Sequence, residues 1–233
     1  MDDIYNSLSF PREGLKGKPY VILNLVQSTD GRASIGGKAS GLGTDVDRRV
    51  MRTLRAKSDA VMVGGGTIRA EKLSLSLDAE DMRPVPQAII MTNSGDVPLE
   101  TNLVRDPRQK VLVLLPESAG QGAEKHVEHL AEIRRVPGTT SGGIDVQRAM
   151  EILNSDYGIE VLLCEGGPTL NRTLIEADLV DEMFLTIAPM LVGEQKPGPS
   201  STQSQERPRS LGLISSQVIG DEIFARYTMK RDS

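Results

Sequence analysis

The sequence has one cysteine and no tryptophan, and aromatic residues make up only 3% of its 233 residues. A single cysteine excludes an intramolecular disulfide and a cysteine-rich metal site. Because aromatic side chains are scarce, a packed core must consist of valine, leucine, isoleucine, methionine and alanine. No apolar run approaches the roughly 20 residues that span a bilayer, so we expect no membrane partner.

Histidine is almost as scarce, and the two histidines, His126 and His129, lie in a polar stretch over residues 121–130. Their spacing could place both on one face of a helix, but no partner ligand motif accompanies them. We interpret this stretch as a solvated surface helix and expect no bound metal.

Positive charge is in deficit, because the sequence has 27 lysine and arginine residues against 32 aspartate and glutamate residues, which gives a net charge of −5. This balance disfavours non-specific binding to nucleic acid or to an anionic membrane surface. The first residues include neither a basic segment nor an apolar stretch, so we expect no secretory signal and a cytoplasmic location. The length suits one α/β domain over residues 1–233.

Short apolar runs alternate with segments of helical periodicity along the chain. The predicted strands cover residues 20–26, 59–63, 87–92, 110–115, 132–136, 159–164, 182–191, 211–219 and 222–230. The predicted helices cover residues 45–57, capped by Thr44 or Asp45, a short segment after residue 66, residues 145–154 and residues 168–177. This order predicts an α/β fold with a mainly parallel sheet, flanked by helices and ending in an antiparallel hairpin. An irregular arm over 1–18 and an exposed loop over 193–209 complete the domain.

Two glycine-rich junctions follow predicted strands, at Gly64-Gly65-Gly66-Thr67 and at Glu165-Gly166-Gly167-Pro168-Thr169-Leu170. Glycines let a ligand approach the backbone, and the start of a helix offers N–H groups and a positive dipole end to an anion. Either junction alone could be an ordinary turn, and neither matches a P-loop or a spaced dinucleotide fingerprint. The two together predict a nucleotide-dependent enzyme.

Charged residues near these junctions are further candidates. Asp30 follows the first predicted strand in an Asp-Gly turn, where it is either a turn residue or a carboxylate at the mouth of the sheet. Arg48, Arg52 and Arg55 recur on one face of the next predicted helix. This cationic stripe could meet a phosphate or could be a solvated helix face.

Four motifs, in order, resemble those of one family. They read S-x-D-G, L-R-A-x-x-D-A-V-x-V-G-x-G-T, E-G-G-P-T-L-N-R-T-L-I-E-A-D-L-V-D-E and A-P-x-L-V-G. The chain thereby resembles, over residues 20–193 and more weakly over the final hairpin, the reductase domain of riboflavin biosynthesis. That domain is the C-terminal half of a bifunctional deaminase/reductase. The resemblance implies a dihydrofolate-reductase-like fold, NADPH as cofactor, a homodimer, and reduction of a phosphoribosylamino-pyrimidine to its ribitylamino product.

The resemblance also implies roles for individual residues. Asp30, in the active-site loop or the proton path, and Glu165, beside the pyrimidine, would be catalytic. The cofactor-binding residues would be Val26, Leu42, Thr44, Gly64, Gly65, Gly66, Thr67, Glu71, Thr92, Gly166, Gly167, Pro168, Thr169, Leu170 and Asn171. The substrate-binding residues would be Ser40, Arg55, Leu75 and Glu165.

The segment after the first junction departs from the family pattern. Glu71 replaces an aspartate, and Asp78 stands where a phosphate-binding arginine is expected, with Arg83 a candidate replacement. These departures leave open a different pterin, imine or carbonyl substrate, or a non-catalytic nucleotide-binding module. The candidates near the 2′-phosphate of the cofactor are Arg69, Asn93 and Ser94.

Overall fold

The computed structural model describes residues 4–12, 17–71, 74–75, 77, 83–98, 103, 106–120, 122, 125, 128–129, 131–140, 142–193 and 208–230. The strands within this part are β1 (Tyr20–Ser28), β2 (Ala60–Gly64), β3 (Gln87–Met91), β4 (Val111–Pro116), β5 (Glu132–Val136), β6 (Val161–Cys164), β7 (Glu182–Ala188), β8 (Leu211–Ile219) and β9 (Glu222–Met229). The helices are η1 (Ala39–Gly41), α1 (Asp45–Arg55), α2 (Gly65–Ala70), α4 (Val146–Ser155) and α5 (Pro168–Glu176).

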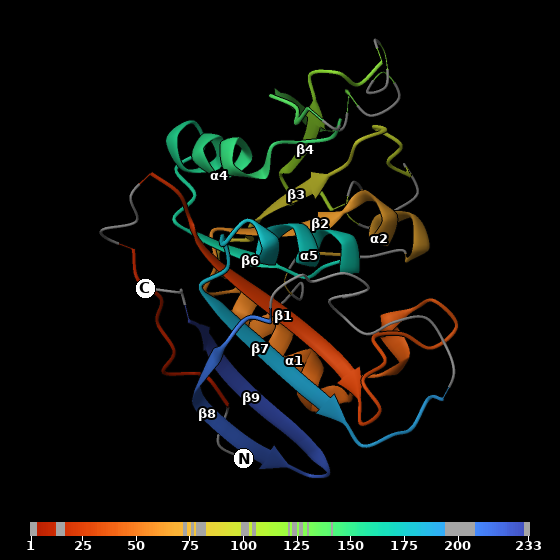
Figure 1. Ribbon diagram of the computed structural model, residues 1–233, viewed down its shortest axis with the longest axis vertical. Helices are drawn as coiled ribbons and strands as arrows, with labels where there is room; N and C mark the ends of the chain where they lie inside the picture. The colour runs from red at the N-terminus through yellow and green to blue at the C-terminus, as the bar shows by residue number, and fades with distance from the viewer. Residues whose placement is uncertain are drawn as a thin grey trace.

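The strands form one sheet in the order β5-β4-β3-β2-β6-β1-β7-β9-β8 (Figure 1). Neighbours from β5 to β7 pair in parallel, whereas β9 is antiparallel to β7 and β8 is antiparallel to β9. The predicted mainly parallel sheet with a C-terminal hairpin is therefore confirmed.

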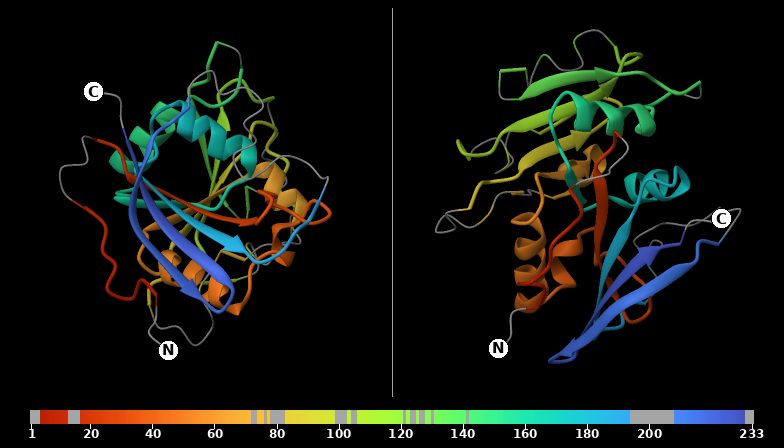
Figure 2. Two further views of the ribbon diagram at one scale, coloured as in Figure 1. Left: turned by 60° about the horizontal axis from the view of Figure 1, so that its bottom comes forward. Right: turned by 90° about the vertical axis from the view of Figure 1, so that its left-hand side faces the viewer.

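Helices cover both faces of the sheet (Figure 2). On one face α4 and α5 pack on alternate residues of the central strands, such as Leu23 of β1. On the other face Val50 and Leu54 of α1 pack with Ile22 and with residues of the N-terminal segment. The alternation along β1 follows from the period of two in a strand.

α1 begins where its sequence predicts and ends at Arg55, two residues before the predicted end. The Thr44 hydroxyl accepts a hydrogen bond of 3.1 Å from the Val46 N–H and so acts as the N-cap. Aspartates occupy the first turn and arginines the last turn, which suits the helix dipole. The predicted cap at Thr44 is confirmed.

Two expectations change, and a third gains detail. The described residues of the stretch 121–130 lie in turns rather than in a helix, with the Lys125 N–H donating to the Gly122 carbonyl at 3.1 Å. β7 ends at Ala188, short of the predicted residue 191, because Pro189 has no N–H for the ladder. The predicted arm is irregular but packed, since Ile4 is only 5% exposed and the Tyr5 ring meets Phe184 edge-on at 4.9 Å. Most of the predicted loop 193–209 lies outside the described residues.

Unequal strand lengths create an opening in the middle of the sheet. β6 pairs with β1 only as far as Cys164 opposite Leu23, whereas β1 continues beside β7 to Ser28 opposite Ala188. The chain leaves β1 towards α1 on one face and leaves β6 towards α5 on the other. Such a divergence of connections at the carboxyl ends of strands is where ligands bind in open α/β sheets.

Candidate functional site

The two predicted glycine junctions meet at this opening. The Gly64 N–H donates to the Gly166 carbonyl at 2.7 Å, and the Gly166–Gly167 peptide bond is cis. A Cβ atom on Gly167 would lie 2.5 Å from Oγ1 of Thr67, and one on Gly65 would lie 2.7 Å from Oγ1 of Thr92. The glycines are therefore required by close approach, and the structure brings Thr67 and Thr92 to the same place as both junctions.

The start of α5 offers donors at the junction. Gly167 precedes the helix, Pro168 opens it, and Pro168 and Thr169 are exposed. The Asn171 N–H already donates to the Gly167 carbonyl at 3.0 Å, so the N–H groups of Thr169 and Leu170 lie in the turn that has no intrahelical acceptors. Together with the helix dipole, they suit the pyrophosphate of a dinucleotide.

Three predicted ligand residues have side chains in the core. Leu170 is 7% exposed and Asn171 2%, and the Cys164 thiol donates to Oδ1 of Asn171 at 3.5 Å. Burial raises the pKa of that thiol to about 12. Leu75 is fully buried among the residues that pack with α1. The ligand roles of Leu75, Leu170 and Asn171 stay predictions, and their side chains lie in the core at the edge of the opening.

Arg55 and Glu165 form a buried ion pair beside the opening. Nε of Arg55 donates to Oε1 of Glu165 and Nη2 to Oε2, both at 2.7 Å, while Nη1 donates to the Ser74 carbonyl at 3.0 Å. The Arg55 side chain is 5% exposed and the Glu165 side chain 10%. Arg48, from the same predicted stripe, is exposed and pairs with Asp45. The fork geometry lets Arg55 fix the orientation of the Glu165 carboxylate.

Asn24 is a candidate site residue that the sequence analysis missed. The register places Leu23 opposite Cys164, so Asn24 and Glu165 follow side by side as the two strands diverge. Residues 22 and 163 face α1, and the period of two puts Asn24 and Glu165 on that same face. Its signal in the sequence is a single amide inside an apolar run.

Asp30 joins two loops. Its carboxylate accepts hydrogen bonds from the Ser28 hydroxyl at 2.5 Å, the Gly193 N–H at 2.9 Å and the Val192 N–H at 3.2 Å. These hydrogen bonds lower the pKa of Asp30 to about 2, and the bond from Ser28 contributes most. A carboxyl group with so low a pKa is a poor acid near neutral pH, so the structure favours the loop-ordering alternative for Asp30.

The loop after β1 forms one wall of the opening. The Glu71 carboxylate accepts the Ala39 N–H at 2.8 Å and so holds this loop, while its predicted contact with the cofactor stays a prediction. Leu42 is 1% exposed, and the Thr44 N–H donates a hydrogen bond to the buried Glu222 carboxylate. Val26 is half-buried on β1, opposite Thr186 of β7. Ser40 lies in η1, and its side chain is outside what the structure describes.

Asp47 is a second carboxyl group near this wall. Burial, the main cause, and the nearby charge of Glu222 raise the pKa of Asp47 to about 6, although a hydrogen bond with the Thr186 hydroxyl acts in the other direction. A Cβ atom on Gly43 would overlap the Asp47 carboxylate. The glycine before the helix is therefore needed to accommodate Asp47.

The structure describes only some of the residues considered for phosphate binding. Asp78 lies outside the described residues, and Arg83 is exposed. Nη1 of Arg69 donates to the Asp96 carbonyl at 2.9 Å, and Nε lies 3.7 Å from the Asp96 carboxylate. Asn93 faces Gly143, so residues 93 and 94 lie beside the loop that follows β5.

Other kinds of site find no support in the part of the chain that the structure covers. Its helices are all too short or too polar to cross a membrane. Among the same residues, no group of three or more histidine, cysteine, aspartate or glutamate side chains is arranged to hold a metal ion.

The chain is similar to known proteins over most of its length. A family model described as the RibD C-terminal domain matches residues 19–225. The 2,5-diamino-6-ribosylamino-4(3H)-pyrimidinone 5′-phosphate reductase of Methanothermobacter thermautotrophicus is 29% identical over 223 residues, which cover 91% of this chain and 99% of the relative. The reductase of the same name from Archaeoglobus fulgidus is 30% identical over 76% of this chain and 83% of the relative.

Solved structures share the fold at lower identity. Form 2 of Acinetobacter baumannii RibD superposes with a TM-score of 0.75 at 22% identity and covers 92% of this chain. This chain spans only 58% of that RibD chain. The riboflavin biosynthesis reductase Rib7 of Saccharomyces cerevisiae superposes with a TM-score of 0.71 at 19% identity and covers 92% of this chain and 91% of Rib7.

Proposed function

Since this chain belongs to the RibD C-terminal domain family and its relatives are pyrimidine reductases of riboflavin biosynthesis, we propose that it is an NADPH-dependent pyrimidine reductase. The observation that carries the proposal is the meeting of both glycine junctions beside the buried Arg55–Glu165 pair. One side of the opening suits a dinucleotide and the other suits a polar heterocycle.

NADPH is the proposed cofactor, and when bound it supplies the hydride. The N–H groups of Thr169 and Leu170, with the Thr67 hydroxyl close to Gly167, are the proposed cradle for its pyrophosphate. We assign the nicotinamide to the wall of Val26, Leu42 and Thr44. Arg69, Asn93 and Ser94 remain the proposed neighbours of the 2′-phosphate.

The ion pair favours a substrate with adjacent N–H donors. A carboxylate offers only acceptors, and the two N–H groups of Arg55 leave further lone pairs on Glu165 for a ligand. A 2-aminopyrimidin-4-one presents its 2-amino group next to the ring N3–H, whereas a uracil presents a carbonyl oxygen at that position. Two carboxylate oxygens can accept both donors of the first but would face an oxygen of the second. We therefore propose the non-deaminated diaminopyrimidinone as substrate.

Asn24 would complete the contact with the ring. Its amide carries both a donor and an acceptor, so it can bind an edge that alternates N–H and C=O groups. At the sugar, the N-glycoside opens to an imine, whose C1 carbon accepts the hydride while its nitrogen accepts a proton. The product then carries a C–N single bond, which is the ribitylamino group. In this scheme Asn24 and Glu165 hold the pyrimidine so that C1 faces the nicotinamide wall.

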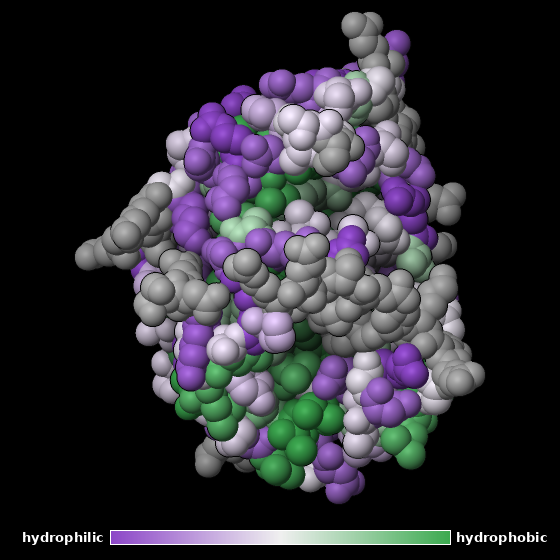
Figure 3. Space-filling model, viewed as in Figure 1, coloured by the Kyte–Doolittle hydropathy of each residue, from purple (hydrophilic) through white to green (hydrophobic). Residues whose placement is uncertain are grey.

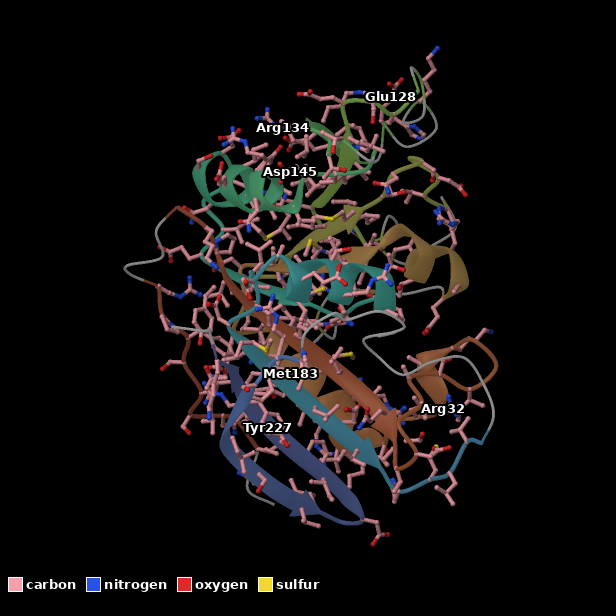
Figure 4. All side chains as sticks on the ribbon, in the orientation of Figure 1. Arg32, Glu128, Arg134, Asp145, Met183 and Tyr227 are labelled. Carbon is pink, nitrogen blue, oxygen red and sulfur yellow. The ribbon has the colours of Figure 1, made fainter. Side chains whose placement is uncertain are left out.

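A homodimer through the C-terminal hairpin is part of the proposal. Exposed apolar side chains crowd this hairpin, with Leu213 60%, Val218 70% and Ile223 41% exposed. Apolar residues also gather on the face seen in Figure 3, below the helices. Met183 and Tyr227, paired across β7 and β9, lie in this region (Figure 4). Apolar patches of this kind typically mark protein interfaces.

We also propose a cytoplasmic location, since the buried free Cys164 requires no oxidising compartment.

Consumption of NADPH by the purified protein tests the function, with the amino and oxo forms of the phosphoribosylaminopyrimidine offered separately. We expect turnover on the amino form and a much lower kcat/KM on the oxo form. Preference for the oxo form would refute the assignment of Glu165. Tight binding of NADPH without turnover on either form would instead favour a different pterin, imine or carbonyl substrate, or a non-catalytic module.

A further inference from the structure

Two carboxylates hold the loop of residues 39–44, one at each end. Glu71, just after α2, accepts the Ala39 N–H at 2.8 Å. Glu222, the first residue of β9, accepts the Thr44 N–H at 3.2 Å and a second hydrogen bond from the Thr44 hydroxyl. The loop is therefore held between the helix that follows β2 and the C-terminal hairpin.

Glu222 is an unusual residue to bury. Only 2% of its surface is exposed, and a carboxylate that loses its water must regain hydrogen bonds inside the protein. Thr44 provides two of them and caps α1 with the same hydroxyl, through the Val46 N–H. One side chain of the hairpin thus fixes both the end of loop 39–44 and the start of α1.

α1 extends this attachment to the other end of the site. The helix begins beside Glu222 and ends at Arg55, whose guanidinium holds Glu165. Its 11 residues span about 16 Å as one hydrogen-bonded unit, so a displacement at the first turn is carried to the last.

We propose that Glu222 is a positioning residue for the reduction. Through Thr44, Glu222 fixes the position of loop 39–44, the wall against which the nicotinamide packs. Through α1, it also fixes the position of the Arg55–Glu165 pair. The C-terminal hairpin is thereby coupled to the reductase site. This inference rests on the proposed function, because the nicotinamide is assigned to that wall there.

Glu222→Gln tests the proposal with Glu182→Gln as matched control. Glu182 is also buried, at 5% exposure, but it pairs with Arg226 and Tyr20 at the opposite end of the β7–β9 ladder. We expect Glu222→Gln to weaken direct binding of NADPH, followed by its fluorescence, at least tenfold and to lower kcat. Glu182→Gln should lower Tm while leaving both quantities unchanged at a temperature where it is folded. Without NADPH, amide hydrogen exchange over residues 39–46 should quicken in Glu222→Gln only.

Thr44→Val removes the hydroxyl hydrogen bond to Glu222 but keeps the bond from the Thr44 N–H. Because Thr44 is exposed, this variant remains informative if Glu222→Gln does not fold. Thr44→Val should also weaken NADPH binding, and the double variant should bind no more weakly than the weaker single variant. Additive losses, equal losses in Glu182→Gln, or unchanged NADPH binding in Glu222→Gln would overturn this proposal alone. A wild-type protein that fails to bind NADPH would overturn the proposed function and this inference together.

Discussion

Replacing Arg55 with methionine should destabilise the fold by about 3–5 kcal/mol, because it leaves Glu165 buried without its partner. The magnitude follows from the 5% and 10% exposure of the two side chains and from the paired 2.7 Å hydrogen bonds. For a chain of this size, such a loss lowers Tm by about 6–20 °C. Arg48→Met is the matched control on the same helix, since the pair of Arg48 with Asp45 is exposed and is worth less than about 1 kcal/mol.

A second substitution separates stability from function. Arg55→Met combined with Glu165→Leu removes both charges, so most of the lost stability should return, because apolar side chains of similar size fill the space. Turnover should remain absent, since the carboxylate that binds the pyrimidine is gone. Urea unfolding followed by circular dichroism gives the stability, and NADPH oxidation gives the turnover. A stability loss below about 1 kcal/mol in Arg55→Met, or turnover retained by the double variant, would show that the pair is not the buried anchor described here.

Three further predictions concern other parts of the opening. The native pKa of Asp47, about 6, lies above its unfolded value, so the native state binds the proton more tightly and stability falls as pH rises from about 4 to above 6. Asp47→Asn should therefore raise the free energy of unfolding at pH 8 by about 1–2 kcal/mol, seen as a higher Tm, and leave Tm unchanged at pH 4. A rise in Tm at pH 4 instead would contradict the direction of the pKa shift. The pKa of Asp30 is lowered to about 2, so its contribution is present above about pH 4 and is lost as pH falls towards 2. Asp30→Asn should accordingly speed hydrogen exchange at residues 192–193 at pH 7, and no change there would exclude the loop-ordering role. Gly167→Ala brings a Cβ atom to 2.5 Å from Oγ1 of Thr67 and should weaken NADPH binding at least tenfold in a fluorescence titration, whereas Gly120→Ala, with open space around it, should not.

The order and type of the elements follow from the sequence because they depend on local rules. The Thr44 cap, the apolar runs of the parallel strands and the Gly220-Asp221 turn between β8 and β9 need only neighbours in the chain. The stretch 121–130 was interpreted from its polarity alone, and the positive φ of Gly122 within it favours turns.

The candidate site was only partly predictable, because its geometry depends on strand register. The sequence identified Glu165 and Arg55 separately, but their pairing requires α1 to end level with the end of β6. Asn24 becomes a candidate site residue only because β6 stops at Cys164, opposite the residue before it. Leu170 and Asn171 belong to the correct motif, yet their side chains turn into the core because the helix period places them there.

The early end of β6 has a consequence for the protein in the absence of ligands. Beyond Leu23 the edge of β1 has no strand beside it on that side within the described ranges, so no strand pairs with its N–H and C=O groups there. An open strand edge is a template for pairing with another chain and hence an aggregation hazard. A flat ligand that carries an amide group could bond to this edge as a further strand would. Occupancy of the site should therefore protect the protein during heating and storage, apart from any effect on catalysis.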